Sequence, residues 1–117
     1  MPAPRRPSTL HRLSEEYARV RAELAQLGYI LQGSVIERRM PCGKAGCACT
    51  TDTQAWHGPY IQWSRKKKAR TVSTYLTPEQ AAVCRQWIDN NRKLEAIIAR
   101  MRDLSRRITR AHELPKL

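Results

Sequence analysis

The stretch Cys42-Gly-Lys-Ala-Gly-Cys47-Ala-Cys49, followed after seven residues by His57-Gly-Pro-Tyr60, decides how the rest of the chain is organised. The residues between these groups are mostly small or polar, so this segment can wrap an ion but cannot build a core. Three thiols and an imidazole are a donor set that zinc binds in closed tetrahedral sites, which supply folding free energy to small polar segments. We therefore predict a Zn²⁺ site formed by Cys42, Cys47, Cys49 and His57.

The spacing of these ligands, Cys-x4-Cys-x-Cys-x7-His, differs from the standard spacings of zinc fingers, so zinc is not the only possibility. The plant-type iron–sulfur signature Cys-x4-Cys-x2-Cys is one residue longer, and no obvious fourth cysteine lies nearby. The cysteines could instead form disulfides or stay as unliganded thiols. Cys84 lies apart in a helical pattern, and we interpret it as a small buried hydrophobic residue.

Size and charge restrict the class of protein. A chain of 117 residues predicts a single domain, here over residues 8–117, and residues 1–7, with three prolines and two arginines, predict a flexible basic arm. Twenty-two Lys and Arg against ten Asp and Glu give a net charge of +12, which indicates polyanionic partners.

No apolar run is long enough to cross a bilayer, so we expect a cytoplasmic protein that does not enter membranes. In a reducing compartment, clustered cysteines favour metal binding over disulfides.

Two helices are indicated by apolar residues at steps of three and four. The first is predicted over residues 8–27, beginning at Ser8 or Thr9 and ending at Gly28. The second is predicted over residues 78–112, because Thr77-Pro-Glu-Gln80 combines an N-cap threonine, a proline at the first helical position and a glutamine at the third.

The apolar stripe of the second helix is longer than that of the first. Its members are Val83, Trp87, Leu94, Ile97, Met101, Leu104, Ile108 and Ala111, with Asn90 at one polar position. We expect the two helices to pair as an antiparallel coiled coil, with Asn90 a candidate for fixing the register. The excess stripe would then either fold over the sheet or support self-association around residues 94–108.

Three strands are expected between the helices. Residues 34–40 form the first, and residues 60–65 and 70–76 form a hairpin joined by residues 66–69. The segments together predict an α+β fold: an N-terminal helix, a metal knuckle with a small antiparallel sheet, and a long C-terminal helix. The knuckle and sheet occupy residues 34–76.

Basic residues gather in two regions that we predict to bind nucleic acid. Those of the knuckle and hairpin are expected near one another, with Tyr60, Trp63 and Tyr75 interleaved for stacking on bases or for packing. They are Arg38, Arg39, Lys44, Arg65, Lys66, Lys67, Lys68 and Arg70. On the long helix, the side opposite the apolar stripe carries Arg102, Arg106 and Arg110.

The segments CGKAGCACTTD, HGPY and IQWSRKKKARTVSTYLTPEQ resemble a family of small bacterial domains of unknown function. In that family a Cys-Gly-Lys-x-x-Cys-x-Cys knuckle precedes His-Gly-Pro-Tyr, a basic hairpin with a tryptophan, and a Leu-Thr/Ser-Pro-Glu-Gln helix start. The resemblance covers about residues 24–100. It implies a zinc-binding module found around mobile genetic elements, with no established activity. Many relatives have Gly-Lys at the hairpin turn, where this chain has Lys-Lys-Lys-Ala.

These observations favour a zinc-stabilised nucleic-acid-binding accessory protein, with DNA expected over RNA, which could assist a recombinase or transposase. The alternative is a protein-interaction or dimerisation adaptor that uses the long helix. Catalysis is not expected, because the acidic residues are scattered and a metal with four protein ligands has no open position.

Overall fold

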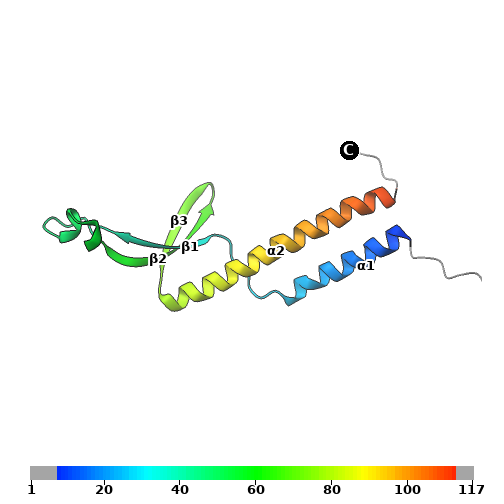
Figure 1. The fold of residues 1–117 in the computed structure, drawn as a ribbon, viewed down its shortest axis with the longest axis horizontal. Coiled ribbons are helices and arrows are strands. Elements are labelled where there is room, and N and C mark those ends of the chain that lie inside the picture. The colour runs from blue at the N-terminus through cyan, green and yellow to red at the C-terminus, as the bar shows by residue number, and fades with distance from the viewer. Residues whose placement is uncertain (1–7, 113–117) are drawn as a thin grey trace, which may run out of the picture. The chain divides into compact units, whose positions relative to one another are not determined.

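The computed structural model describes residues 8–112, so the arm predicted at residues 1–7 lies outside the described residues (Figure 1). The fold is α+β, as predicted. Its contacts form two compact units, one built from the chain up to Tyr29 together with the chain from Asn90, and the other from Ile30–Asp89. The single domain expected over residues 8–117 stays a prediction. Among the described residues, no helix is long and apolar enough to cross a membrane.

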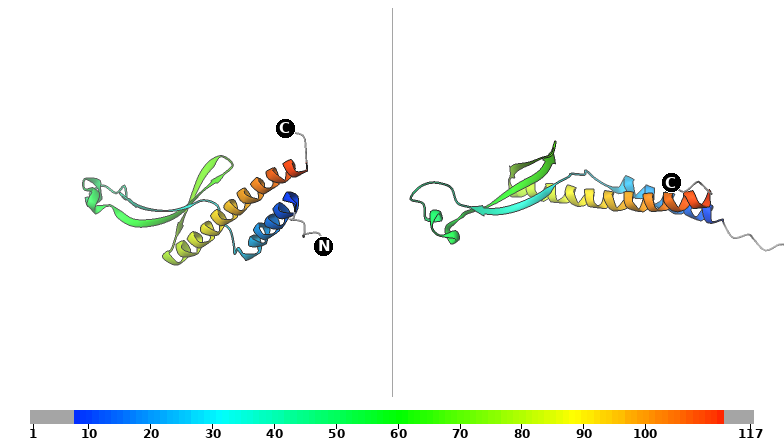
Figure 2. Two further views of the ribbon diagram at one scale, coloured as in Figure 1. Left: turned by 45° about the vertical axis from the view of Figure 1, so that its right-hand side comes forward. Right: turned by 90° about the horizontal axis from the view of Figure 1, so that it is seen from above.

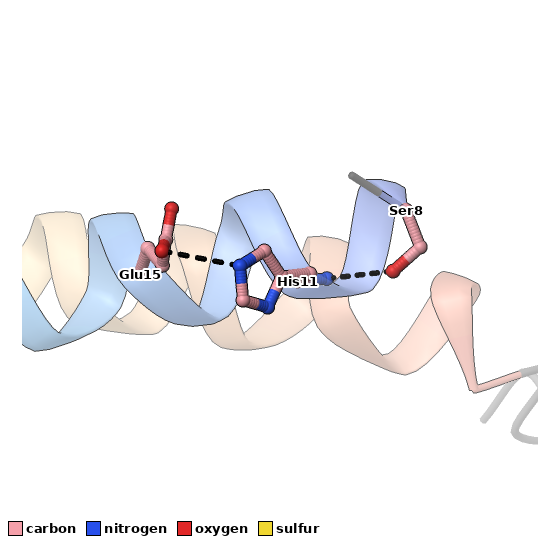
Figure 3. A network of polar contacts seen from close by, with 3 residues as sticks. All are labelled: Ser8, His11 and Glu15. Atoms are coloured by element: carbon pink, nitrogen blue, oxygen red, sulfur yellow. Dashed lines mark hydrogen bonds and ion pairs between the residues drawn. The ribbon is translucent and has the colours of Figure 1, made fainter. Parts of the chain in front are cut away.

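The first unit begins with helix α1, Thr9–Ala22. Its N-cap is Ser8, whose hydroxyl oxygen accepts a hydrogen bond from the backbone N–H of His11 over 3.0 Å (Figure 3). His11 also lies 3.1 Å from the carboxylate of Glu15, one helical turn later. Of the two predicted N-cap residues, Ser8 and Thr9, the structure has Ser8.

The end of this helix differs from the prediction. The α-helix stops at Ala22, and the chain tightens into a 3-10 helix, η1, over Glu23–Gln26. A left-handed glycine does not end it, since the residue that caps α1 is Glu23, in the right-handed region. Gly28 instead allows the side chain of Asn90 to come close to the backbone, because a Cβ at this position would lie 3.2 Å from the side-chain nitrogen of Asn90.

The side chain of Asn90 forms a hydrogen bond that links the two chain segments of the first unit. Its side-chain amide donates to the backbone carbonyl of Tyr29 over 2.8 Å. The absence of a side chain at Gly28 leaves room for this approach. The bond is to the chain after η1 and not to α1, and the predicted role of Asn90 in fixing the helix register stays a prediction.

Helix α2, Pro78–Ala111, runs antiparallel to α1 in the first unit, as both views of Figure 2 show. The shared core is built from Leu13 and Val20 of α1 and Ile97 and Leu104 of α2, each at most 5% exposed. Arg100 of α2 forms an ion pair with Glu23 over 2.9 Å. The predicted antiparallel pairing is present, and coiled-coil geometry stays a prediction.

The expectation of a free apolar stripe around residues 94–108 is wrong. Ile97 and Leu104, which lie at its centre, are buried against α1 within the same chain. The reason is register: the steps of three and four in α1 match the C-terminal part of α2, so the shorter helix covers this part of the stripe. Oligomeric state itself stays a prediction.

The second unit holds a three-stranded antiparallel sheet in the order β1-β2-β3. The strands are β1, Ser34–Met40, as predicted; β2, His57–Lys67, longer at both ends than predicted; and β3, Arg70–Leu76, as predicted. The hairpin connection expected to contain four residues contains two, because Lys67 pairs with Arg70. Both turn residues, Lys68 and Ala69, have positive φ, 50° and 65°, which is the conformation of a type I′ hairpin turn.

The start of α2 is fixed by reciprocal hydrogen bonds. Gln80 donates its backbone N–H to the hydroxyl of Thr77 over 3.1 Å, and Thr77 donates its N–H to the side-chain oxygen of Gln80 over 2.9 Å. In this part of α2 the buried residues are Ala81 and Ile88, whereas the predicted stripe member Val83 is 42% exposed. The predicted stripe is therefore wrong at Val83, although its member Trp87 is half-buried. The prediction continued the phase of the C-terminal half of α2, which packs on a helix, into a half that belongs to the sheet unit.

Candidate metal centre

The knuckle, residues 41–57, connects β1 to β2 and brings the four predicted ligands together. Cys42 follows β1 by two residues, and His57 is the first residue of β2, where it pairs with Met40. Cys47 precedes a short 3-10 helix, η2 (Ala48–Thr50), and Cys49 lies inside it. The antiparallel register thus brings both ends of the knuckle to one place, and η2 turns the two middle cysteines inward.

The ligand atoms of these residues all lie within 4.8 Å of one another. The sulfurs of Cys42 and Cys49 are 3.5 Å apart, and the sulfur of Cys47 is 3.5 Å from Nε2 of His57. A tetrahedral zinc with bonds of about 2.3 Å to sulfur and about 2.0–2.1 Å to nitrogen separates two sulfurs by roughly 3.8 Å, and a sulfur from a nitrogen by roughly 3.5 Å. The four side chains are close enough to bind one metal ion.

The cysteine sulfurs are thiols rather than disulfides. All four cysteines of the chain are free, and the 3.5 Å between Cys42 and Cys49 is far longer than a disulfide bond of about 2.05 Å. Cys49 is 2% exposed, so it forms the inner wall of the site, while Cys42 and His57 are exposed.

The thiols influence one another's ionisation. The pKa of Cys47 lies below its ordinary value because its sulfur accepts a backbone hydrogen bond at Cys49, assisted by the neighbouring thiols. For Cys49, a backbone hydrogen bond from Cys42 lowers the pKa, but burial and the adjacent sulfurs outweigh it and leave the pKa raised. A bound cation would favour the thiolate form of both residues.

Side chains outside the ligand set hold the knuckle in shape. The guanidinium of Arg39 donates from one nitrogen to the backbone carbonyls of Gln54 and Trp56, over 2.9 and 2.8 Å. Asp52 caps a second 3-10 helix, η3 (Thr53–Ala55), by accepting from the N–H of Gln54 over 2.9 Å. Neither support was predicted, since Arg39 was expected to bind nucleic acid and Asp52 had no expected role. The Asp-Thr-Gln sequence is an N-cap signal that could have identified the second.

Gly58 is needed where the knuckle joins β2. Its φ is +123°, and a Cβ there would lie 2.7 Å from the carbonyl oxygen of Arg38 and 2.9 Å from the nitrogen of Tyr60. Any larger residue would therefore collide with backbone on both sides. The glycine of the His57-Gly-Pro segment lets His57 approach the cysteines while β1 and β2 stay paired.

The eight basic residues of the knuckle and hairpin form two groups rather than one. The knuckle cations are Arg38, Arg39 and Lys44, and the tip cations are Arg65, Lys66, Lys67, Lys68 and Arg70. Arg38 pairs with Tyr60, seven residues before Lys67 on β2. At about 3.3 Å per residue these seven steps span roughly 23 Å. The expectation that the eight lie near one another is wrong, because the register places knuckle and hairpin turn at opposite ends of β2.

The remaining predicted contacts lie in the first unit. Arg102, Arg106 and Arg110 are all exposed and recur every four residues, so they share one side of α2. Their contact with nucleic acid, like that of the other basic residues, stays a prediction.

The comparisons with known proteins agree with the resemblance on the kind of family. No curated protein and no solved structure matched the chain. One family model matched residues 10–86, which is more than half of the chain, whereas the resemblance suggested residues 24–100. The match contains the complete knuckle, the sheet and the start of α2. The chain therefore belongs to the family described as Domain of unknown function (DUF6788).

Proposed function

We propose that this chain is a zinc-stabilised module that binds nucleic acid through the tip of its β2–β3 hairpin. Zinc is the metal we propose because three thiols and one imidazole within 4.8 Å suit its tetrahedral, nitrogen- and sulfur-rich coordination. The ion would hold the β1 and β2 ends of the knuckle together. It would thereby stabilise the strand pair that leads to the hairpin tip.

The observation that carries the nucleic-acid proposal is the uncompensated charge of the tip. Residues 57–76 contain no Asp or Glu, and the two-residue turn places Lys66, Lys67, Lys68 and Arg70 within a few residues of one another, all exposed. Lys67 and Arg70 are direct cross-strand partners. Like charges in that position destabilise a sheet, so the arrangement opposes folding and favours an anionic partner.

The adaptor hypothesis has less support. It required an accessible apolar stripe on α2 around residues 94–108, and the central members of that stripe are buried against α1. A role beside a recombinase or transposase remains an expectation from the family resemblance, and DNA remains the nucleic acid that we favour.

The test replaces the three tip lysines together, Lys66→Gln, Lys67→Gln and Lys68→Gln. The matched control, Arg102→Gln, Arg106→Gln and Arg110→Gln, removes the same charge from α2. Affinity for labelled DNA is measured by anisotropy over a salt series, because each lost phosphate contact reduces the salt slope by nearly one. We expect the tip variant to flatten the slope by about two to three on any sequence, and the control by less.

The opposite result would refute the assignment. If the tip variant keeps the affinity and slope of the parent while the α2 variant loses binding, the contact surface is the helix. Light scattering accompanies the titration, because lysines beside an open strand edge also prevent aggregation.

A further inference from the structure

One face of the sheet combines exposed tyrosines with cations. Side chains alternate along a strand, and direct cross-strand partners share a face. On this face Tyr60 lies opposite Arg38, and Tyr75 lies opposite Gln62. A hydrogen bond between the hydroxyls of Ser64 and Ser73, 3.4 Å, confirms the sidedness. We call it the tyrosine face; its members are Ser34, Ile36, Arg38, Tyr60, Gln62, Ser64, Lys66, Thr71, Ser73 and Tyr75.

The other face is the one that α2 adjoins. Glu37, which pairs with Ile61 on that face, forms an ion pair with Arg85 of α2 over 3.0 Å. The backbone of α2 also accepts a hydrogen bond, from Leu31 to Trp87, over 3.1 Å. Arg85 of α2 therefore lies on the face opposite the tyrosines, whereas Pro78, the first residue of the helix, lies beside Tyr60 and Tyr75 at the end of the sheet.

The two tyrosine rings are arranged as an accessible aromatic pair. Their centroids are 5.9 Å apart at an interplanar angle of 65°, and Tyr75 is 62% exposed while Tyr60 is 37% exposed. They border a shallow hollow of about 310 Å³ whose lining is Pro59, Tyr60, Ile61, Tyr75, Leu76 and Pro78. A hollow bordered by two tyrosine rings and apolar side chains can accept a flat apolar group, such as the face of a nucleobase.

Cations flank the aromatic pair on the same face. Arg38 lies one strand spacing from Tyr60, about 4.8 Å in a sheet. At the other end of the face, the Lys66 amine donates to the Thr71 hydroxyl over 2.9 Å, which directs it across the strands. A backbone carrying negative charge could therefore run along the face with its bases at the tyrosines and its phosphates at Arg38 and Lys66.

From this placement we propose that the tyrosine face binds single-stranded DNA, with bases stacked on Tyr75 and Tyr60. Bases in a duplex are stacked on each other and present only their edges, whereas an unpaired base presents the face that a tyrosine ring can cover. The inference rests on the proposed nucleic-acid function and names its substrate class. It differs from that function in requiring bases as well as phosphates.

The experiment compares three labelled oligonucleotides of one length: an oligothymidine strand, the same strand with abasic residues in place of thymidines, and a duplex. The protein is the zinc-loaded full chain, measured as parent, Tyr75→Leu and Tyr75→Phe. Tyr29→Ala is the matched control, since Tyr29 is 75% exposed in the other unit. Hydrogen exchange of the β2 and β3 amides checks that each variant keeps the hairpin.

We expect the parent to bind oligothymidine about tenfold more tightly than the abasic strand, because stacking requires the base. Tyr75→Leu should lose that preference while binding the abasic strand as the parent does, and Tyr75→Phe and Tyr29→Ala should keep it. If the parent binds the thymidine and abasic strands equally, or binds the duplex more tightly than either, the stacking proposal is wrong and the phosphate-binding function stands. If the parent binds none of the three, both fail.

Discussion

The sulfur of Cys47 lies 3.5 Å from Nε2 of His57, although the two residues are ten positions apart in the chain. This distance is about that expected between a sulfur and a nitrogen bound to one tetrahedral zinc. It arises because η2 follows Cys47 directly and β2 begins at His57, so that both groups face the buried sulfur of Cys49.

We predict that Cys47→Ser loses the metal and, with it, the ordered knuckle and the pairing of β1 with β2. The parent should contain one zinc per chain by elemental analysis. Hydrogen exchange should show lost protection in both strands of the variant. Cys84→Ser is the control, because Cys84 is half-buried in α2 and belongs to no ligand cluster among residues 8–112. A metal-free parent whose circular dichroism does not change on chelation would contradict the zinc assignment.

The convergence of the four side chains was predictable from sequence because clustered thiols and an imidazole have few other uses in a polar segment. The supporting groups were not, because their roles depend on where backbone carbonyls lie. Arg39 looks like any surface arginine until the fold places the carbonyls of Gln54 and Trp56 within 2.9 Å of it. In the same way, the separation of knuckle and tip cations follows from the length and register of β2, which composition does not determine.

The hairpin turn offers a stability prediction. Ala69 has φ of 65°, in the left-handed region where an L-residue with a Cβ is disfavoured by roughly 1–2 kcal/mol. Ala69→Gly removes this strain but makes the unfolded chain more flexible, so we expect a net gain of about 0.5–1 kcal/mol in the free energy of unfolding. Urea denaturation of the zinc-loaded protein measures it.

The control for this prediction is Ala82→Gly, an exposed position inside α2, where the same substitution should instead cost about 1 kcal/mol. The opposite signs separate a turn-specific effect from a general effect of glycine. An equal loss in both variants would show that the turn does not hold Ala69 in the left-handed region.

The first half of α2 gives a test of packing. Ile88 is 6% exposed and Val83 is 42% exposed, although both are β-branched residues of the same helix. Ile88→Ala should cost about 2–5 kcal/mol in unfolding free energy, from lost burial and the cavity left behind. Val83→Ala should change it by no more than about 0.5 kcal/mol. If Val83→Ala cost more unfolding free energy than Ile88→Ala, the stripe predicted from sequence would be correct in this half of α2.

The helices illustrate where sequence periodicity succeeds and where it stops. Ser8 and the Thr77–Gln80 pair were predictable because capping is local chemistry, settled within four residues. The buried side of α2 near Ile88 was not, because a stripe extrapolated from the half that packs on α1 does not report what the other half packs against. Periodicity predicts the buried face of a helix only over the residues that pack against one and the same neighbouring element.

Arg39 provides the last prediction, because its two proposed roles have different consequences. If its guanidinium mainly holds the knuckle carbonyls, Arg39→Gln should weaken metal binding by about tenfold, as loss of a supporting hydrogen bond around a metal site does. The measurement is competition with a chromophoric chelator in the absence of nucleic acid. Arg38→Gln is the matched control, with the same charge change at the neighbouring position, where the side chain is exposed on the tyrosine face. Equal metal affinity in the two variants would mean that Arg39 does not support the site. Arg39 would then remain a candidate for binding phosphate, as predicted from the sequence.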